Sequence, residues 1–215
     1  MQIAALIFDD ITPLDIVGPM EVLSRLPKAE VVVVGKTRGP VRDPRTHWIL
    51  TAEAAIEEVT RPDIVVIPGG AGVRPLCREP AMLDWMREVH RHTTWTTSVC
   101  TGSLLLAAAG LLKGLQAATH WSASDDLAEF GATYVEKRVV IQGKIITAAG
   151  VSSGIDMALT LAAKVAGEDM AKRIQLMIEY DPQPPFDSGA PSKADPAMLA
   201  DLRQRMQRAS APPPR

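Results

Sequence analysis

Residues 94–112, TWTTSVCTGSLLLAAAGLL, contain the pattern that decides the fold of this chain. Its first part ends in Val99 and is rich in β-branched side chains, which is typical of a buried strand. From Gly102 onward, small and apolar residues favour a helix. Cys100 therefore falls at a strand-to-helix junction, where its small neighbour Thr101 and the glycine allow the backbone to turn sharply.

The same alternation of strand and helix extends along the chain in both directions. Helical segments with apolar stripes separate short apolar runs, which is typical of βαβ units and of a parallel sheet covered on both faces. We therefore predict an α/β fold, a flavodoxin-like sandwich with a mostly parallel sheet. Strands are expected at 3–8, 30–34, 64–67, 94–99 and 144–147, and helices at 14–26, 80–92, 102–112, 122–130, 153–166 and 168–180.

Two further segments lie outside this alternation. Turn residues predict small hairpins at 36–50 and 135–145, and neither is expected to be catalytic. Eight of the 17 prolines lie at or beyond Pro182. We therefore expect a catalytic domain at 1–181 and a Pro-rich tail at 182–215, with one amphipathic helical stretch at 195–208.

Composition and charge disfavour several classes of protein. The formal net charge is -2, so the chain lacks the long-range attraction that nucleic acid or an anionic membrane requires. No apolar run approaches the roughly 20 residues that span a bilayer, and the N-terminus does not read as a secretory signal. We expect a cytoplasmic protein that binds neither nucleic acid nor membrane. No helix-turn-helix pair follows the core, which argues against a transcription factor.

Cys100 is the candidate nucleophile. The partial positive charge of a helix N-terminus favours a thiolate by ~0.3–1 kcal/mol and lowers the pKa of a cysteine placed there. The alternative is a buried cysteine that acts as a small hydrophobe, and the spacing alone leaves both interpretations open. Cys77 lies in a connection without such a junction and is expected to be inert.

A glycine-rich segment, PGGAG at 68–72, follows another predicted strand at the edge where ligands of parallel sheets bind. The backbone N–H groups of Gly70 and Thr101 are candidates for an oxyanion-type pocket beside the sulfur. A plain turn is the alternative. A dinucleotide loop is excluded because Pro75 stands where a third glycine is needed.

Asp15 follows the first predicted strand, in the segment TPLDIVGP at 12–19. An ordinary N-cap is one interpretation. In the other, Asp15 reaches Cys100, and a carboxylate about 4 Å from a thiolate repels it by ~4 kcal/mol at an effective dielectric constant of 20, which exceeds the helix-dipole effect. The two groups would then share one proton and supply a nucleophile and a general acid together.

Together these motifs resemble the ThiJ/PfpI superfamily over nearly the whole chain. Residues 68–72 are similar to its glycine loop, 98–102 to its nucleophile elbow and 118–121 to the strand end that follows. Within the superfamily, the isocyanide (isonitrile) hydratases are the most similar group, through 14–15 with 18–19, 99–112, 154–163, and 179–180 with 184–186. The last of these segments is the most specific, because it lies outside the shared core.

The resemblance implies a hydro-lyase that converts an isocyanide to an N-substituted formamide through a cysteine thioimidate. It makes Cys100 the nucleophile, Asp15 its acidic partner, and Gly70 and Thr101 parts of the binding pocket. It also implies a homodimer and a small uncharged substrate, with no metal or organic cofactor. A glyoxalase-like enzyme acting on carbonyls, or a ligand- or redox-sensing module, are the alternatives.

Two histidine features complete the candidate site. Protease-like members often have a histidine directly after the cysteine, whereas Thr101 stands there in this chain, so a Cys-His dyad of that kind is not expected. His120 is either a hydrogen-bond donor that supports the catalytic residues near the elbow or a histidine whose hydrogen bonds are made by backbone groups. His90 and His92 do not share a helix face and are not expected to bind a metal.

Overall fold

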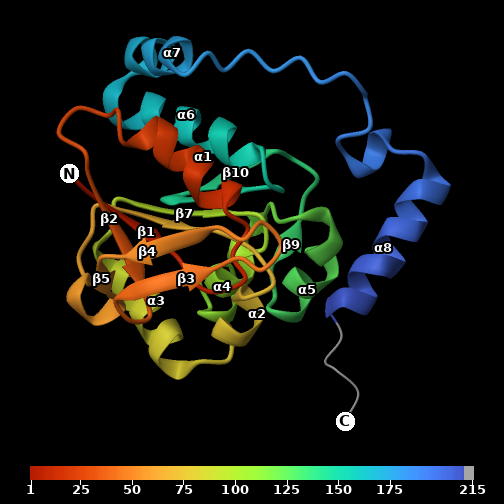
Figure 1. Ribbon diagram of the computed structural model, residues 1–215, viewed down its shortest axis with the longest axis horizontal. Helices are drawn as coiled ribbons and strands as arrows, with labels where there is room; N and C mark the ends of the chain where they lie inside the picture. Colours follow the sequence, from red (N-terminus) through yellow and green to blue (C-terminus); the bar gives the residue numbers. More distant parts are fainter. Residues whose placement is uncertain (211–215) are drawn as a thin grey trace. The chain divides into compact units, whose positions relative to one another are not determined.

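The computed structural model describes the backbone of residues 1–210 and the side chains of residues 1–206. The chain forms two compact units, Met1–Ile178 and a second unit that begins at Glu179. The first unit is built on a seven-stranded sheet (Figure 1). Its strands lie in the order β10 (Val139–Gln142), β11 (Ile145–Ala148), β7 (Trp95–Val99), β6 (Ile64–Ile67), β1 (Gln2–Leu6), β2 (Glu30–Gly35) and β5 (Ala54–Ala55).

Pairing within this sheet is parallel except at one edge, where β10 runs antiparallel to β11. All four residues of β6 are buried, as expected for a central strand covered on both faces. The α/β sandwich with a mostly parallel sheet is therefore confirmed. Two small sheets are separate from it: β3 (Gly39–Arg42) with β4 (Ile49–Ala52), and β8 (Gln116–Ala117) with β9 (Thr133–Tyr134).

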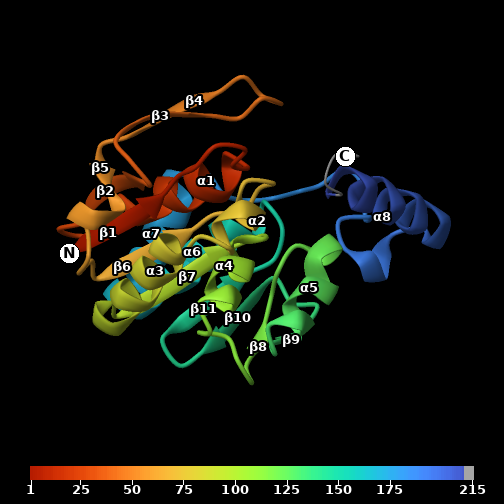
Figure 2. The same cartoon turned by 90° about the horizontal axis from the view of Figure 1, so that it is seen from below.

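Helices cover both faces of the sheet, as Figures 1 and 2 show. One layer contains α1 (Leu14–Leu23), α6 (Ser153–Ala166) and α7 (Glu168–Met177), which pack on one another in that order. The other contains α2 (Val73–Leu76), α3 (Pro80–His92), α4 (Gly102–Ala108) and α5 (Ser124–Glu129). No helix among the described residues is long and apolar enough to cross a membrane.

The helix that follows Cys100 is shorter than predicted. The expected helix at 102–112 ends at Ala108, because Gly110 adopts a left-handed backbone with φ 85°. Gly110 and Leu111 donate their N–H groups to the carbonyls of Ala107 and Leu106, at 2.8 and 3.0 Å. This is a Schellman motif, which satisfies the free carbonyls at the end of the helix.

Both predicted hairpins are present. The first comprises β3 and β4, and the second comprises β10 and β11 around Gly143, whose φ is 60°. Some elements were not predicted because they are too short to show a clear periodicity in the sequence. Among them are β5, β8, β9 and α2.

The second unit is described by itself. It contains a 3-10 turn at Pro191–Lys193 and the helix α8 (Pro196–Ser210), in place of the predicted stretch 195–208. The Asp195 carboxylate accepts the N–H groups of Ala197 and Met198, both at 3.0 Å, and so caps the start of the helix.

Gly102 is where the elbow and the neighbouring strand meet most closely. A β-carbon at this position would lie 2.2 Å from the carbonyl oxygen of Ile67, a backbone atom at the end of β6. Only glycine fits without a shift of strand or helix.

We therefore expect Gly102→Ala to lower the free energy of unfolding by about 1–3 kcal/mol, since the added methyl group would displace backbone. Urea unfolding followed by circular dichroism measures this change. Gly189→Ala is the control, because a β-carbon there would meet nothing within 4 Å. Equal unfolding midpoints for the wild type and Gly102→Ala would contradict the close approach.

Candidate active site

The topology brings three segments of the candidate site to one edge of the sheet. Strand β6 pairs in parallel with β1 on one side and β7 on the other, so the carboxyl ends of all three lie together. Cys100 follows β7, the glycine loop at 68–72 follows β6, and Asp15 lies on α1, which follows β1. A bridge between Ile11 and Gly70 joins the first segment to the glycine loop.

Cys100 has an unusual backbone, with φ 58° in the left-handed region that non-glycine residues rarely adopt. Hydrogen bonds hold it from both sides. Its N–H donates to the carbonyls of Ala148 and Ala149, each at 3.1 Å. Its carbonyl accepts the hydroxyls of Ser103 at 3.2 Å and Thr119 at 3.1 Å. The predicted turn between strand and helix is therefore present at Cys100. The spacing of the motif did not indicate that the hydroxyls of Ser103 and Thr119 would hydrogen-bond to its carbonyl.

Asp15 is the second residue of α1, and it is not an N-cap. Pro13 occupies that position, and the Asp15 side chain is buried in the interior, with no exposed surface. Its Oδ2 accepts the N–H of Gly69 at 3.0 Å. Its Oδ1 is buried and has no hydrogen-bond partner among the described residues. One carboxylate oxygen is thus anchored by the glycine loop.

Burial gives the Asp15 carboxyl an unusual pKa, raised from its ordinary 3.8 to about 7. The loss of solvation is the largest cause, since it disfavours the charged form. The Gly69 N–H, the neighbouring Cys100 thiol and the positive charge of Arg45 each oppose it in part. Asp15 therefore changes its protonation state near neutral pH.

The pKa of the Cys100 thiol is raised well above its ordinary value, first by burial and then by the charge of Asp15. Cys100 is only 5% exposed. The N–H of Thr101 opposes these effects without reversing them. The lowering expected from the helix N-terminus is therefore overcome, because burial acts together with the carboxylate. As the pH rises, Asp15 ionises first and the proton on sulfur remains.

Thr101 and the glycine loop are linked directly. Gly70 donates its N–H to the Thr101 hydroxyl oxygen at 2.9 Å, and Gly69 donates its N–H to Asp15. Of the two N–H groups predicted to stabilise an anion, that of Thr101 acts on the sulfur, whereas that of Gly70 already has a protein partner. Substrate binding by Gly70 stays a prediction.

His120 makes its hydrogen bonds within its own turn. Its Nδ1 accepts the N–H of Ser122 at 3.3 Å and lies 2.7 Å from the Ser122 hydroxyl oxygen. The ring lies against Gly150, where a β-carbon would come within 2.4 Å of Cδ2. Burial lowers the pKa of His120. Of the residues in this strand end, Thr119 is the one that bonds to the elbow, and a catalytic contribution from His120 stays a prediction.

His90, His92 and Cys77, for which the sequence predicted no role in the site, have other surroundings. His90 pairs with the Thr96 hydroxyl at 2.8 Å, and His92 pairs with Glu88 at 3.0 Å. Among the described residues, no three His, Cys, Asp or Glu side chains are grouped closely enough to hold a metal ion. Burial raises the pKa of Cys77 to about 11, so this thiol is protonated at neutral pH.

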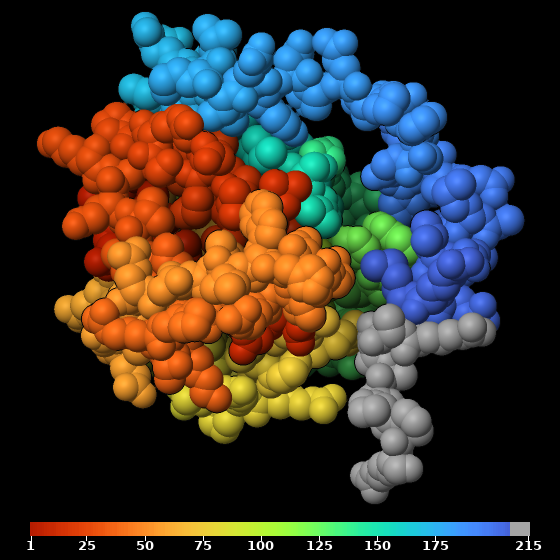
Figure 3. Space-filling view, viewed as in Figure 1, coloured from red at the N-terminus to blue at the C-terminus, as the bar shows by residue number. Residues whose placement is uncertain are grey.

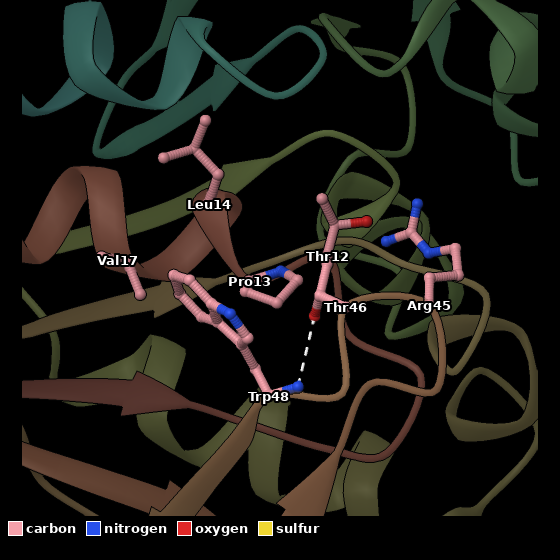
Figure 4. A pocket seen from close by; sticks show the side chains of 7 residues that line it. All are labelled: Thr12, Pro13, Leu14, Val17, Arg45, Thr46 and Trp48. Carbon is pink, nitrogen blue, oxygen red and sulfur yellow. Dashed lines mark hydrogen bonds between the residues drawn. The ribbon is translucent and has the colours of Figure 1, made fainter.

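A cavity of about 210 Å³ adjoins the segment that carries Asp15. Its walls come from the start of α1 and from the turn of the β3–β4 hairpin, which Figure 3 shows in orange against the red N-terminal residues. Neither Cys100 nor Asp15 is part of its lining. Seven side chains line it, as shown in Figure 4: Thr12, Pro13, Leu14, Val17, Arg45, Thr46 and Trp48.

The α/β sandwich with a mostly parallel sheet is shared with a known family. The sequence profile of the DJ-1/PfpI family matches residues 1–164, and the chain belongs to this family. Isonitrile hydratase from Pseudomonas putida is 43% identical over 205 residues, which cover 95% of this chain and 90% of that protein.

Two further relatives indicate the breadth of the family. The crystal structure of a ThiJ/PfpI family protein from Pseudomonas syringae superposes with a TM-score of 0.92 at 34% identity, covering 97% of this chain and 87% of the other. The HTH-type transcriptional regulator CdhR of Pseudomonas aeruginosa is 33% identical over 131 residues, which are 58% of this chain and 38% of the regulator. The family therefore includes proteins named as enzymes and as regulators.

The raised pKa of Asp15 predicts a specific dependence of stability on pH. Between pH 4 and 7 the folded state holds a proton on this carboxyl that the unfolded state releases, so stability falls as the pH rises through this range. A shift of about three pKa units corresponds to a loss on the order of 4 kcal/mol. Asp15→Asn removes this contribution. Urea unfolding from pH 4 to 8 measures the difference.

Asp84→Asn, which removes an exposed carboxylate outside the site, is the control for the loss of one negative charge. Parallel stability curves for the wild type and Asp15→Asn would contradict the raised pKa.

Proposed function

We propose that this protein hydrates isocyanides, R–NC, to N-substituted formamides, with Cys100 as nucleophile and Asp15 as the group that moves protons. The observation that carries the proposal is the buried carboxyl with a pKa of about 7 beside a thiol that stays protonated. The similarity to an isonitrile hydratase over 95% of the chain supports the choice of substrate.

The first step forms the carbon–sulfur bond. The Asp15 carboxylate takes the proton of the Cys100 thiol as Sγ attacks the terminal carbon of the isocyanide. Asp15 then delivers that proton to the same carbon. New C–S and C–H bonds convert R–N≡C into a thioimidate, R–N=CH–S–Cys100, and leave Asp15 ionised.

The second step returns the enzyme to its starting state. Water adds its oxygen to the thioimidate carbon, one of its protons moves to nitrogen, and the C–S bond breaks. The other proton passes through Asp15 to the departing sulfur. The products are R–NH–CHO and the Cys100 thiol, and no net oxidation or reduction occurs.

The raised thiol pKa is compatible with this route, because Asp15 removes the proton during the attack and no thiolate need accumulate. Burial keeps Asp15 basic enough to accept the proton at neutral pH. The side-chain interaction between Asp15 and Cys100 supports this transfer. Thr101 N–H stabilises negative charge on sulfur when the C–S bond breaks. We also propose that residues 1–181 form the catalytic domain.

Substitution of Cys100 or Asp15 should strongly lower the kcat for a simple alkyl isocyanide. Asp15→Val removes the group that transfers protons. Because general acid–base catalysis typically contributes this much, we expect kcat to fall about 10²–10⁴-fold. Cys100→Ser replaces the thiol by a weaker nucleophile and should lower kcat on the order of 10³-fold or more. Formamide production followed by proton NMR measures both.

Cys77→Ser is the matched control and should retain wild-type turnover. Unchanged turnover in Cys100→Ser or Asp15→Val would refute the role of that residue. A higher kcat/KM for methylglyoxal than for the isocyanide would refute the substrate class and favour a glyoxalase-like enzyme.

The protonation states of Asp15 and Cys100 predict how kcat/KM depends on pH. Below pH 7 Asp15 is protonated and no base is present for the thiol proton, so kcat/KM should rise with pH to a plateau above about pH 7. The profile should not fall again until the thiol ionises, which its raised pKa places at strongly alkaline pH. Initial rates from pH 5 to 9 measure the profile. A profile that declines through pH 7 would exclude Asp15 as the base.

A further inference from the structure

The proposed reaction requires space for the organic substituent of the substrate. An isocyanide is linear, so when its terminal carbon lies at Cys100 the group R must extend away from the reacting pair. The cavity between α1 and the β3–β4 turn adjoins the segment that carries Asp15. That segment is fixed to the glycine loop, since Thr12 N–H donates to the carbonyl of Gly69 at 2.8 Å.

The cavity lining matches an uncharged, apolar group. Pro13, Leu14 and Val17 form one wall, and the indole of Trp48 extends toward it from the hairpin (Figure 4). None of the described residues that line the cavity carries a carboxylate. Arg45 is the cation among the described lining residues, and its Nε lies 3.5 Å from the Asp43 carboxylate oxygen, with which it forms an ion pair.

The hairpin turn that carries Trp48 is held in a fixed conformation. The Asp43 carboxylate is 2% exposed and accepts the N–H groups of Arg45 and Thr46, both at 3.2 Å, and the Thr46 hydroxyl at 2.6 Å. Asp43 N–H also donates to the Trp48 carbonyl at 3.1 Å, which closes the turn. Trp48 is therefore presented by a rigid turn, yet its side chain is 53% exposed.

We propose that this cavity is the subsite for the substituent R, and that Trp48 determines which substituents are accepted. The inference rests on the proposed function. A rigid, half-exposed indole over an apolar cavity gains contact area when the cavity fills, and this gain increases with the apolar area of the ligand. Larger apolar substituents should therefore be preferred, through Trp48.

Kinetics with two substrates test this inference. We expect Trp48→Ala to lower the ratio of kcat/KM for cyclohexyl isocyanide to that for methyl isocyanide on the order of tenfold, whereas Trp48→Phe keeps most of the preference. Ile49→Ala is the matched control. Ile49 belongs to the same hairpin and is 50% exposed, but it does not line the cavity, so the ratio should not change.

An unchanged ratio in Trp48→Ala, or an equal change in Ile49→Ala, would overturn the assignment. An unchanged ratio together with an altered sedimentation coefficient in Trp48→Ala would identify the surface as a contact with another chain. Binding of N-cyclohexylformamide, measured by calorimetry, is independent of turnover. The subsite predicts binding that weakens about tenfold in Trp48→Ala even if the wild type hydrates no isocyanide, and absence of binding to the wild type would overturn it.

Discussion

The left-handed backbone of Cys100 is the constraint on which the site depends. A backbone φ of 58° is unfavourable for a residue that carries a side chain, so the surrounding structure must hold Cys100 in this conformation. The carbonyls of Ala148, at the end of β11, and of Ala149 accept its N–H, and the hydroxyls of Ser103 and Thr119 donate to its carbonyl. The lack of a side chain at Gly69 and Gly102 allows the end of β6 to approach the elbow. These hydrogen bonds and close approaches hold strand β7, the glycine loop and helix α4 together at Cys100.

Burial, more than the helix N-terminus, determines the electrostatics of the site. Desolvation is the largest contribution to the pKa of both Asp15 and Cys100, and it favours the protonated form of each. The hydrogen bond from Gly69 opposes this effect and keeps the pKa of the Asp15 carboxyl near neutral, at about 7. The pair can thus exchange one proton without building up two negative charges in an apolar interior, which suits chemistry on an uncharged substrate.

The β3–β4 hairpin shows how a segment with no catalytic motif can become part of a site. Turn residues at 36–50 indicate a hairpin and nothing more. In the folded chain, Arg45 affects the protonation of Asp15, and Trp48 forms a wall of the adjoining cavity. Both effects depend on where the turn packs, and that position follows from long-range contacts that a sequence pattern does not encode.

By itself, the sequence determined the α/β class, the main strands and the elbow at Cys100, because these follow from local periodicity and from small residues at a junction. It left open whether Asp15 was a helix cap or a partner of the thiol. Only the tertiary structure excluded the cap, by placing Pro13 at the N-cap and burying the Asp15 carboxyl against Gly69. It also raised the pKa of the Cys100 thiol, against the lowering that the helix N-terminus alone would produce. The physical reason is the same in both cases: burial and the proximity of groups distant in the chain arise only when parallel strands align their carboxyl ends.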